Sequence, residues 1–196
     1  MADTRDQAVW TGHAAQQLEI AAYRPQEGGL PDRLTAALNA EEWMSVLDFG
    51  CGTGLWRAMF PPTFNFLKRY IGLDQNEAMI AGAKQRWPDE IDSFILCPGV
   101  VDGATMPFED GRFDVVFTSA VLQHCTDGDK VPVLREIRRV LRRGGRLIMF
   151  ENTFGWFNPG EEDGRSHSQD AWRGLIEPFG FARTSVDRDL HVFRAM

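Results

Sequence analysis

The chain has 196 residues, of which 43% are hydrophobic and 25% charged, and its formal net charge is −7. This composition is typical of an ordinary globular protein, and the length suits a single domain over residues 1–196 with a sizeable core. The negative charge disfavours nucleic acid as a partner, because a polyanion would be repelled on average. We expect no membrane partner either, since no apolar run approaches the length of a membrane span.

The number and spacing of the cysteines indicate the cellular compartment and whether a metal site is expected. The three cysteines, Cys51, Cys97 and Cys125, are widely separated, and no two of them form a CxxC pair. A zinc knuckle or a dithiol site is therefore disfavoured, and we predict no metal. Three unpaired thiols favour a reduced, cytoplasmic protein.

The N-terminal segment predicts two helices. Thr4 to Gln7 has the pattern of a capping box, and apolar residues at helical spacing continue to about Tyr23. Pro31 suits the first position of a second helix that reaches about Trp43. We interpret residues 1–43 as a lid over a ligand site.

From Ser45 the predicted elements alternate between strands and helices. The predicted strands are 46–50, 69–73, 94–97, 113–118, 146–150, 182–187 and 190–195. The predicted helices are a short one after Gly54 that Pro61-Pro62 ends, 76–87, a short one near 120–125, 131–142 beginning with Pro132, and 168–178. Such alternation predicts a parallel sheet with helices on both faces. The last two strands are too close for a crossover helix, so we expect them to pair antiparallel.

The most informative segment is Val46–Gly54, which reads VLDFGCGTG. An apolar strand enters three glycines at alternate positions, as expected where a buried strand turns sharply and a ligand lies against main chain. Asp74 ends the next apolar strand, 20 residues after Gly54. An acidic side chain at that separation suits the two hydroxyls of an adenosine ribose. The pair therefore predicts an adenosine-containing cofactor.

Two details of this loop favour S-adenosylmethionine over a dinucleotide. The glycines Gly50, Gly52 and Gly54 depart from the GxGxxG spacing that pyrophosphate binding normally uses. Asp48, two residues before the first glycine, suits a cationic ligand such as an α-amino group or a sulfonium. A carboxylate there would repel a pyrophosphate.

Taken together, these residues resemble the class I S-adenosylmethionine-dependent methyltransferases, and the resemblance covers nearly all of residues 40–196. Five segments carry it in the family's order: Val46–Gly54, Gly72–Met79, Asp102–Asp114, Leu122–His124 and Leu134–Leu147. The resemblance implies an α/β, Rossmann-like three-layer sandwich whose seven-stranded, mostly parallel sheet has a reversed last strand. That agrees with the independent interpretation of the two C-terminal strands.

The resemblance also implies residue roles around the loop. Gly50, Gly52 and Gly54 would hold the methionine part of the cofactor, and Asp74 the ribose. One departure from the family pattern is Pro61-Pro62, which leaves the helix after the loop unusually short. This departure affects the packing of that helix rather than the chemistry.

Further implied contacts lie beyond the second strand. Gln75 and Met79 would flank the adenine. Asp102 and Gly103 would contact its edge, although the family more often has a slightly larger residue than Gly103. Thr118 would lie under the cofactor.

Catalytic candidates follow the fourth and fifth strands, where parallel strands open toward substrate. His124 is the best candidate for a general base; the alternative is a histidine that caps a neighbouring loop. Glu151 and Asn152 follow the fifth strand directly, and ordinary loop chemistry is the alternative for both. His167 fits a cap region better, and His191 a structural or solvent-facing place.

We therefore predict a methyltransferase that moves a methyl group to an oxygen, nitrogen or carbon atom of a small molecule. A protein N-terminal amine methyltransferase is the first alternative, because that family shares the positions of His124 and Asn152. A module that binds S-adenosylmethionine without turnover is the second. A dehydrogenase is the least favoured.

Overall fold

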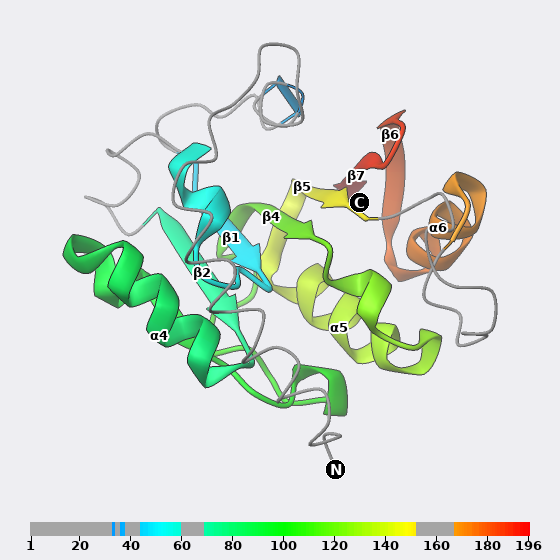
Figure 1. The fold of residues 1–196 in the computed structure, drawn as a ribbon. Helices are drawn as coiled ribbons and strands as arrows, with labels where there is room; N and C mark the ends of the chain where they lie inside the picture. Colours follow the sequence, from blue (N-terminus) through cyan, green and yellow to red (C-terminus); the bar gives the residue numbers. More distant parts are fainter. Residues whose placement is uncertain (1–32, 34–35, 38–43, 60–68, 152–166) are drawn as a thin grey trace, which may run out of the picture. The chain divides into compact units, whose positions relative to one another are not determined.

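The structure is a computed structural model that describes residues 33, 36–37, 44–59, 69–151 and 167–196 (Figure 1). The chain forms two compact units, residues 1–99 and 100–196, which we describe in turn. The predicted lid, residues 1–43, lies almost wholly outside the described residues. The lid and the single-domain organisation therefore stay predictions.

Three parallel strands organise the first unit. They are β1 (Val46–Phe49), β2 (Tyr70–Asp74) and β3 (Phe94–Leu96), in the order β3-β2-β1. All of β1 and the first four residues of β2 are buried, which explains why both read as apolar runs without alternation. The register sets Asp48 opposite Gly72 and Phe49 opposite Leu73, so that the ends of β1 and β2 lie next to each other.

Helices of the first unit follow its strands. From residue 44 to residue 99, the described helices are the 3₁₀ helix η1 (Leu55–Met59), the α-helix α4 (Glu77–Arg86) and the 3₁₀ segment η2 (Pro88–Ser93). Helix α4 begins where the Asn76 side chain accepts a hydrogen bond from the Met79 amide, which is a typical N-cap. Its bounds confirm the predicted helix 76–87 within one residue at each end.

Four strands organise the second unit. They are β4 (Phe113–Ser119), β5 (Leu141–Phe150), β6 (Phe181–Asp187) and β7 (Leu190–Ala195). Strand β4 pairs parallel with β5, and β7 pairs antiparallel with both β5 and β6. The strands of the described residues follow the order β3-β2-β1-β4-β5-β7-β6 in one sheet of seven. The reversed last strand of the prediction is therefore confirmed.

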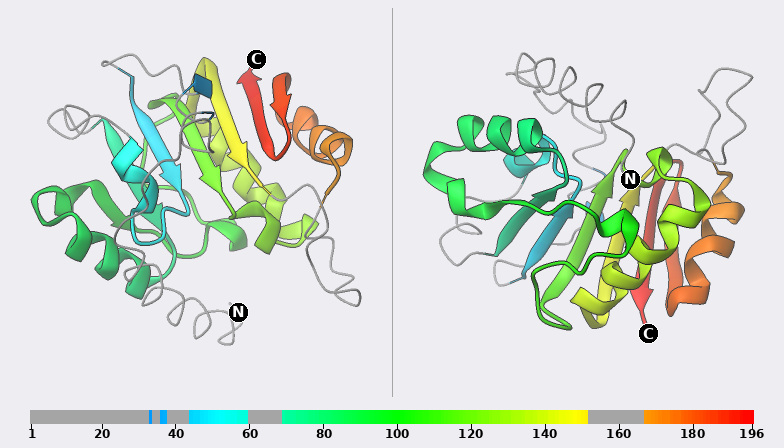
Figure 2. Two further views of the ribbon diagram at one scale, coloured as in Figure 1. Left: turned by 45° about the horizontal axis from the view of Figure 1, so that its top comes forward. Right: turned by 90° about the horizontal axis from the view of Figure 1, so that it is seen from below.

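Helices α5 (Asp127–Val140) and α6 (Gln169–Ile176) belong to the second unit. Three short 3₁₀ helices accompany them: η3 (Val100–Asp102), η4 (Leu122–His124) and η5 (Glu177–Phe179). Helix α5 packs against β5, and α6 against β6 (Figure 2). The apolar side chains Leu134 and Ile137 of α5 are completely buried. In the described part of the chain, no helix has the length and apolar character that crossing a membrane needs.

The predicted start of the helix at 131 was wrong. Helix α5 begins at Asp127 because Thr126 and Asp129 form a reciprocal capping box. Pro132 therefore lies inside the helix, although a proline is best tolerated in a first turn.

The start of the fifth strand also differs from the prediction. Strand β5 begins at Leu141, immediately after α5, whereas we expected it at Arg146. Its pairing with β4 is interrupted between Leu141 and Arg146, and Gly144 has a left-handed backbone with φ of 77°. The Gly144-Gly145 pair therefore lies at an irregularity within the strand.

Candidate functional site

The glycine loop of the first unit has the backbone that its sequence predicts. The amides of Gly50 and Cys51 both donate to the carbonyl of Leu73, at 2.7 and 3.0 Å, so β2 holds the start of the loop. Gly50, Gly52 and Gly54 have φ values of 75°, 54° and 70°, a region that side chains disfavour. A Cβ on Gly54 would also lie 2.9 Å from Cε1 of Phe94. Both the backbone conformation and the lack of space for a Cβ therefore require glycine at position 54.

Asp74, at the end of β2, connects this loop to the start of α4. Its Oδ2 accepts from the Gly52 amide and its Oδ1 from the Asn76 amide, both at 2.9 Å. Burial raises the pKa of Asp74 above its ordinary value, and the backbone donors oppose that effect. The Gln75 amide is a further donor to this carboxylate, and because a carboxylate has about four acceptor sites, capacity for a further hydrogen bond remains.

Asp48 is a buried carboxylate in β1. Its Oδ2 accepts from the Tyr70 hydroxyl at 2.6 Å, whereas Oδ1 has no hydrogen-bond partner among the described residues. The side chain is only 1% exposed, and this burial, with the nearby charge of Asp74, raises its pKa to about 7 despite the Tyr70 bond. The ionised form of such a carboxylate is costly unless a partner compensates its charge, and a cationic ligand would supply that compensation.

The remaining predicted cofactor residues differ in exposure. In the first unit, Gln75 is exposed directly after β2, and Met79 is buried in the first turn of α4. In the second unit, Asp102 ends η3 and Gly103 follows it, both exposed. Gly103 has a φ of 89° and open space where a Cβ would be, so conformation alone explains the glycine. Thr118, in β4, is completely buried.

The ends of β4 and β5 hold two of the three catalytic candidates. Glu151 is 1% exposed, and its carboxylate accepts from the Thr118 hydroxyl at 2.9 Å and from the Gln123 amide at 3.0 Å. Burial raises the pKa of Glu151, and these donors oppose the rise. His124 is half-buried in η4, and Asn152 lies outside the described residues.

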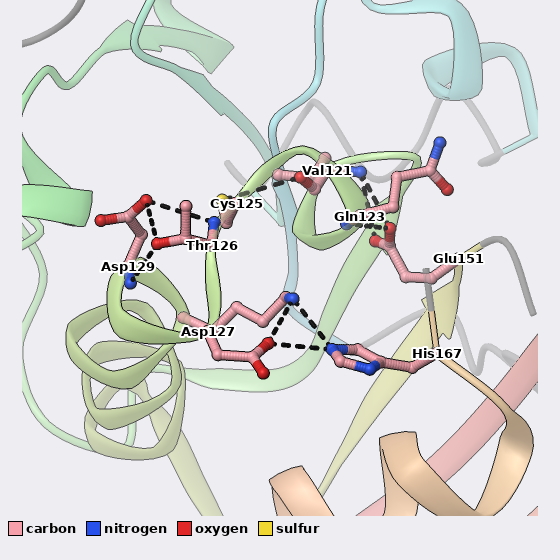
Figure 3. A network of polar contacts seen from close by, with 9 residues as sticks. Val121, Gln123, Cys125, Thr126, Asp127, Asp129, Glu151 and His167 are labelled. Atoms are coloured by element: carbon pink, nitrogen blue, oxygen red, sulfur yellow. Dashed lines mark hydrogen bonds and ion pairs between the residues drawn. The ribbon is translucent and has the colours of Figure 1, made fainter. Parts of the chain in front are cut away.

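Sequence reasoning missed an ionic cluster at the starts of α5 and α6 (Figure 3). His167 Nε2 lies 2.9 Å from Asp127 Oδ1 and 3.1 Å from Lys130 Nζ, and Lys130 Nζ lies 2.8 Å from the same Asp127 oxygen. Lys130 is completely buried and lies over the Trp172 ring. Burial alone would raise the pKa of Asp127, but its bonds to Lys130 and His167 lower it. His167 directly precedes Ser168, the N-cap of α6, which confirms its expected cap-region place.

We expected His191 to be either structural or solvent-facing, and the structure shows that it is structural. It is completely buried in β7, its ring is stacked with that of Phe193, and burial lowers its pKa to about 4. No group of three or more histidine, cysteine or acidic residues in the described ranges has the arrangement of a metal site.

A family model described as a methyltransferase domain matches residues 47–149, which is more than half of the chain. The chain belongs to this methyltransferase-domain family. The match contains most of β1, the glycine loop, β2, β3, β4 and most of β5.

Curated relatives of this methyltransferase domain match over a similar region. An uncharacterized 37.1 kDa protein in a Streptomyces fradiae transposon is 38% identical over 115 residues, 59% of this chain and 32% of that protein. A demethylmenaquinone methyltransferase of Lactococcus lactis is 36% identical over 111 residues, 56% of this chain and 42% of the relative. The chain thus spans less than half of the length of these two relatives.

Solved structures support the fold. A Pyrococcus horikoshii protein has a TM-score of 0.67 at 20% identity, covering 85% of this chain and 88% of its own. An S-adenosylmethionine-dependent methyltransferase from Aquifex aeolicus has a TM-score of 0.67 at 16% identity, covering 92% and 97%. At these identities the likeness shows the fold alone, and it confirms the predicted Rossmann-like α/β class.

Proposed function

We propose that the chain is an S-adenosylmethionine-dependent methyltransferase that moves a methyl group to an oxygen, nitrogen or carbon atom of a small molecule. The observation that carries the proposal is Asp48, a buried carboxylate with an unsatisfied oxygen, in the strand that enters the glycine loop. A cationic ligand stabilises the charged form of such a group, whereas a pyrophosphate destabilises it. Membership of the methyltransferase-domain family supports the same cofactor.

The residues of the first unit suit the cofactor in named roles. Gly50, Gly52 and Gly54 would let the methionine part approach the backbone, and Asp48 would face its positive charge. Asp74 has acceptor capacity left for a ribose hydroxyl, because its backbone donors, the amides of Gly52, Asn76 and Gln75, do not fill its about four acceptor sites. Gln75 and Met79, with Asp102, Gly103 and Thr118 of the second unit, complete the proposed contacts.

When bound, S-adenosylmethionine supplies a methyl group that is already activated by a sulfonium. The protein then has to exclude water and hold the accepting atom in line at about 3 Å. A general base is needed only where the accepting atom carries a proton at working pH. We propose His124 for that role, with Asn152 as a further contact to substrate.

The curated relatives guide the choice of substrate. Because the Lactococcus lactis relative is named a demethylmenaquinone methyltransferase, we propose a small molecule with an aromatic or quinone-like ring. Cys51, Cys97 and Cys125 form no disulfide in the described part of the chain, which supports our proposal of a reduced, cytoplasmic protein. The net charge of −7 supports the proposal that nucleic acid is not a partner.

A screen for methyl transfer tests the function. The purified chain would be incubated with S-adenosylmethionine and separate pools of hydroquinones, phenols and amines, and with peptides that have a free N-terminal amine. The readout is S-adenosylhomocysteine release, with a heat-inactivated sample as control. Turnover in a small-molecule pool supports the proposal. Turnover with peptides alone would favour the N-terminal amine alternative, and binding without turnover in any pool would favour a binding module.

A further inference from the structure

The carboxylate of Glu151 is held by β4 and by the turn that follows it. Its Oε1 accepts from the Thr118 hydroxyl at 2.9 Å and from the Val121 amide at 3.2 Å. Its Oε2 accepts from the Val121 amide at 3.1 Å and from the Gln123 amide at 3.0 Å (Figure 3). Hydrogen bonds to a charged, buried acceptor are the strong ones. The carboxylate thus connects the end of β5 with a neighbouring turn through several strong bonds.

The backbone at the start of this turn needs such support. Ala120 has a φ of 54°, in the left-handed region that a residue with a Cβ disfavours. Its amide donates to the Phe150 carbonyl at 2.9 Å, so the residue immediately before Glu151 also holds the turn. A disfavoured conformation persists only where surrounding contacts over-determine it, and these contacts all come from the end of β5.

We propose that Glu151 is a positioning residue: it sets the backbone of residues 121–124 and thereby the placement of the Gln123 and His124 side chains. The proposal rests on the proposed function in so far as His124 acts on substrate. A general base needs an oxygen that substrate can reach, and the Glu151 side chain is 1% exposed with both oxygens occupied. The carboxylate instead accepts hydrogen bonds from the backbone amides of the turn.

Glu151 holds the backbone of the turn, while the Gln123 side chain extends away from it (Figure 3). The Gln123 side chain points away from the carboxylate that its own amide binds (Figure 3). The amide of His124 donates to the Val121 carbonyl at 3.0 Å, which places His124 one hydrogen bond beyond the residue that Glu151 contacts twice. Movement of the Val121 amide would therefore carry the half-buried His124 with it.

Glu151→Gln tests this role because it keeps the side-chain shape while it places an NH₂ donor against backbone N–H donors. Glu136→Gln is the matched control: Glu136 also accepts from a backbone amide, that of Met106 at 2.8 Å, but far along α5 from the turn. The measurements are hydrogen exchange of the amides of residues 121–123 and the position of the His124 imidazole resonances, assigned with His124→Gln. We expect at least tenfold faster exchange and displaced His124 resonances in Glu151→Gln, and neither change in Glu136→Gln.

A second pair of variants keeps the test decisive if Glu151→Gln does not fold. Thr118→Val removes one donor to the carboxylate, whereas Thr118→Ser keeps it. We expect Thr118→Val to displace the His124 resonances and Thr118→Ser to restore the wild-type position. Unchanged exchange and unchanged His124 resonances in the folded variants would overturn the proposal. Because neither measurement needs cofactor or substrate, its failure is distinguishable from failure of the methyltransferase assignment.

Discussion

Replacing Asp48 by Asn removes the buried charge that we assign to cofactor binding. The change keeps the size of the side chain and an oxygen for the Tyr70 hydroxyl, which now donates to Oδ2 at 2.6 Å. Folding raises the pKa of Asp48 from 3.8 to about 7. At about 1.4 kcal/mol for each pKa unit, the ionised carboxylate costs the native state up to about 4 kcal/mol at pH 8.

The sign of the pH dependence follows from that shift. Between pH 3.8 and about 7 the native state retains a proton that the unfolded chain has lost, so this group destabilises the fold as pH rises through that window. Asp48→Asn removes the effect. We therefore expect the variant without ligand to be more stable than wild type at pH 8, by between about 1 and 4 kcal/mol, and by less than about 2 kcal/mol at pH 5.

Denaturant unfolding, followed by tryptophan fluorescence at pH 8 and pH 5, measures this difference. Asp92→Asn, which changes an exposed carboxylate in the same unit, is the control and should show no such pH-dependent gain. The same Asp48→Asn substitution should weaken S-adenosylmethionine binding by at least about tenfold, because the compensating charge is gone. The reasoning would be refuted by a variant no more stable than wild type at pH 8, or by a gain that does not shrink at pH 5.

Three further predictions test the loop and the second unit. Asp74→Ala removes the acceptor of the Gly52 amide and should weaken S-adenosylhomocysteine binding by about tenfold or more in calorimetry; unchanged affinity in a folded variant would contradict the ribose assignment. Gly54→Ala should destabilise the fold by about 1–3 kcal/mol in urea unfolding, whereas Gly174→Ala, in an α6 position with open space, should stabilise it by about 0.5–1 kcal/mol. His191 has a folded pKa of about 4, below its ordinary 6.5, so its contribution is present above pH 6.5 and is lost as pH falls toward 4. His191→Leu should remove up to about 3 kcal/mol of that acid destabilisation, and an unchanged pH profile would count against the burial argument.

The first unit was predictable because its signals are local. Strands β1 and β2 are apolar runs apart from Asp48 and Asp74, the Asn76 cap lies next to its helix, and the positive φ angles of the loop require glycine. The start of α5 was missed although its signal was local too. Pro132 resembled a first helical position, whereas the capping box of Thr126 and Asp129 decides where the helix begins.

The surroundings of Glu151 and Lys130 could not be predicted, because they depend on residues far apart in the sequence. Glu151 bonds to residues 28 to 33 positions earlier in the chain, and only the pairing of β4 with β5 brings these groups together. Lys130 is buried over Trp172, a residue of another helix that no local pattern connects with it. A candidate residue can therefore be located at a strand end from sequence, but whether it faces substrate or the backbone depends on tertiary contacts.

Binding of the proposed cofactor is the central claim, and a thermal-shift comparison of the purified chain tests it most directly. The chain would be heated with S-adenosylmethionine, S-adenosylhomocysteine, NAD or buffer, after any copurified nucleoside has been removed and identified. A ligand at about a hundred times its dissociation constant adds about 2.7 kcal/mol, which raises the midpoint of a domain of this size by several degrees. We expect both adenosyl compounds to raise the midpoint and NAD to leave it unchanged. A shift with NAD alone, or no shift with either adenosyl compound, would contradict the assignment of S-adenosylmethionine as cofactor.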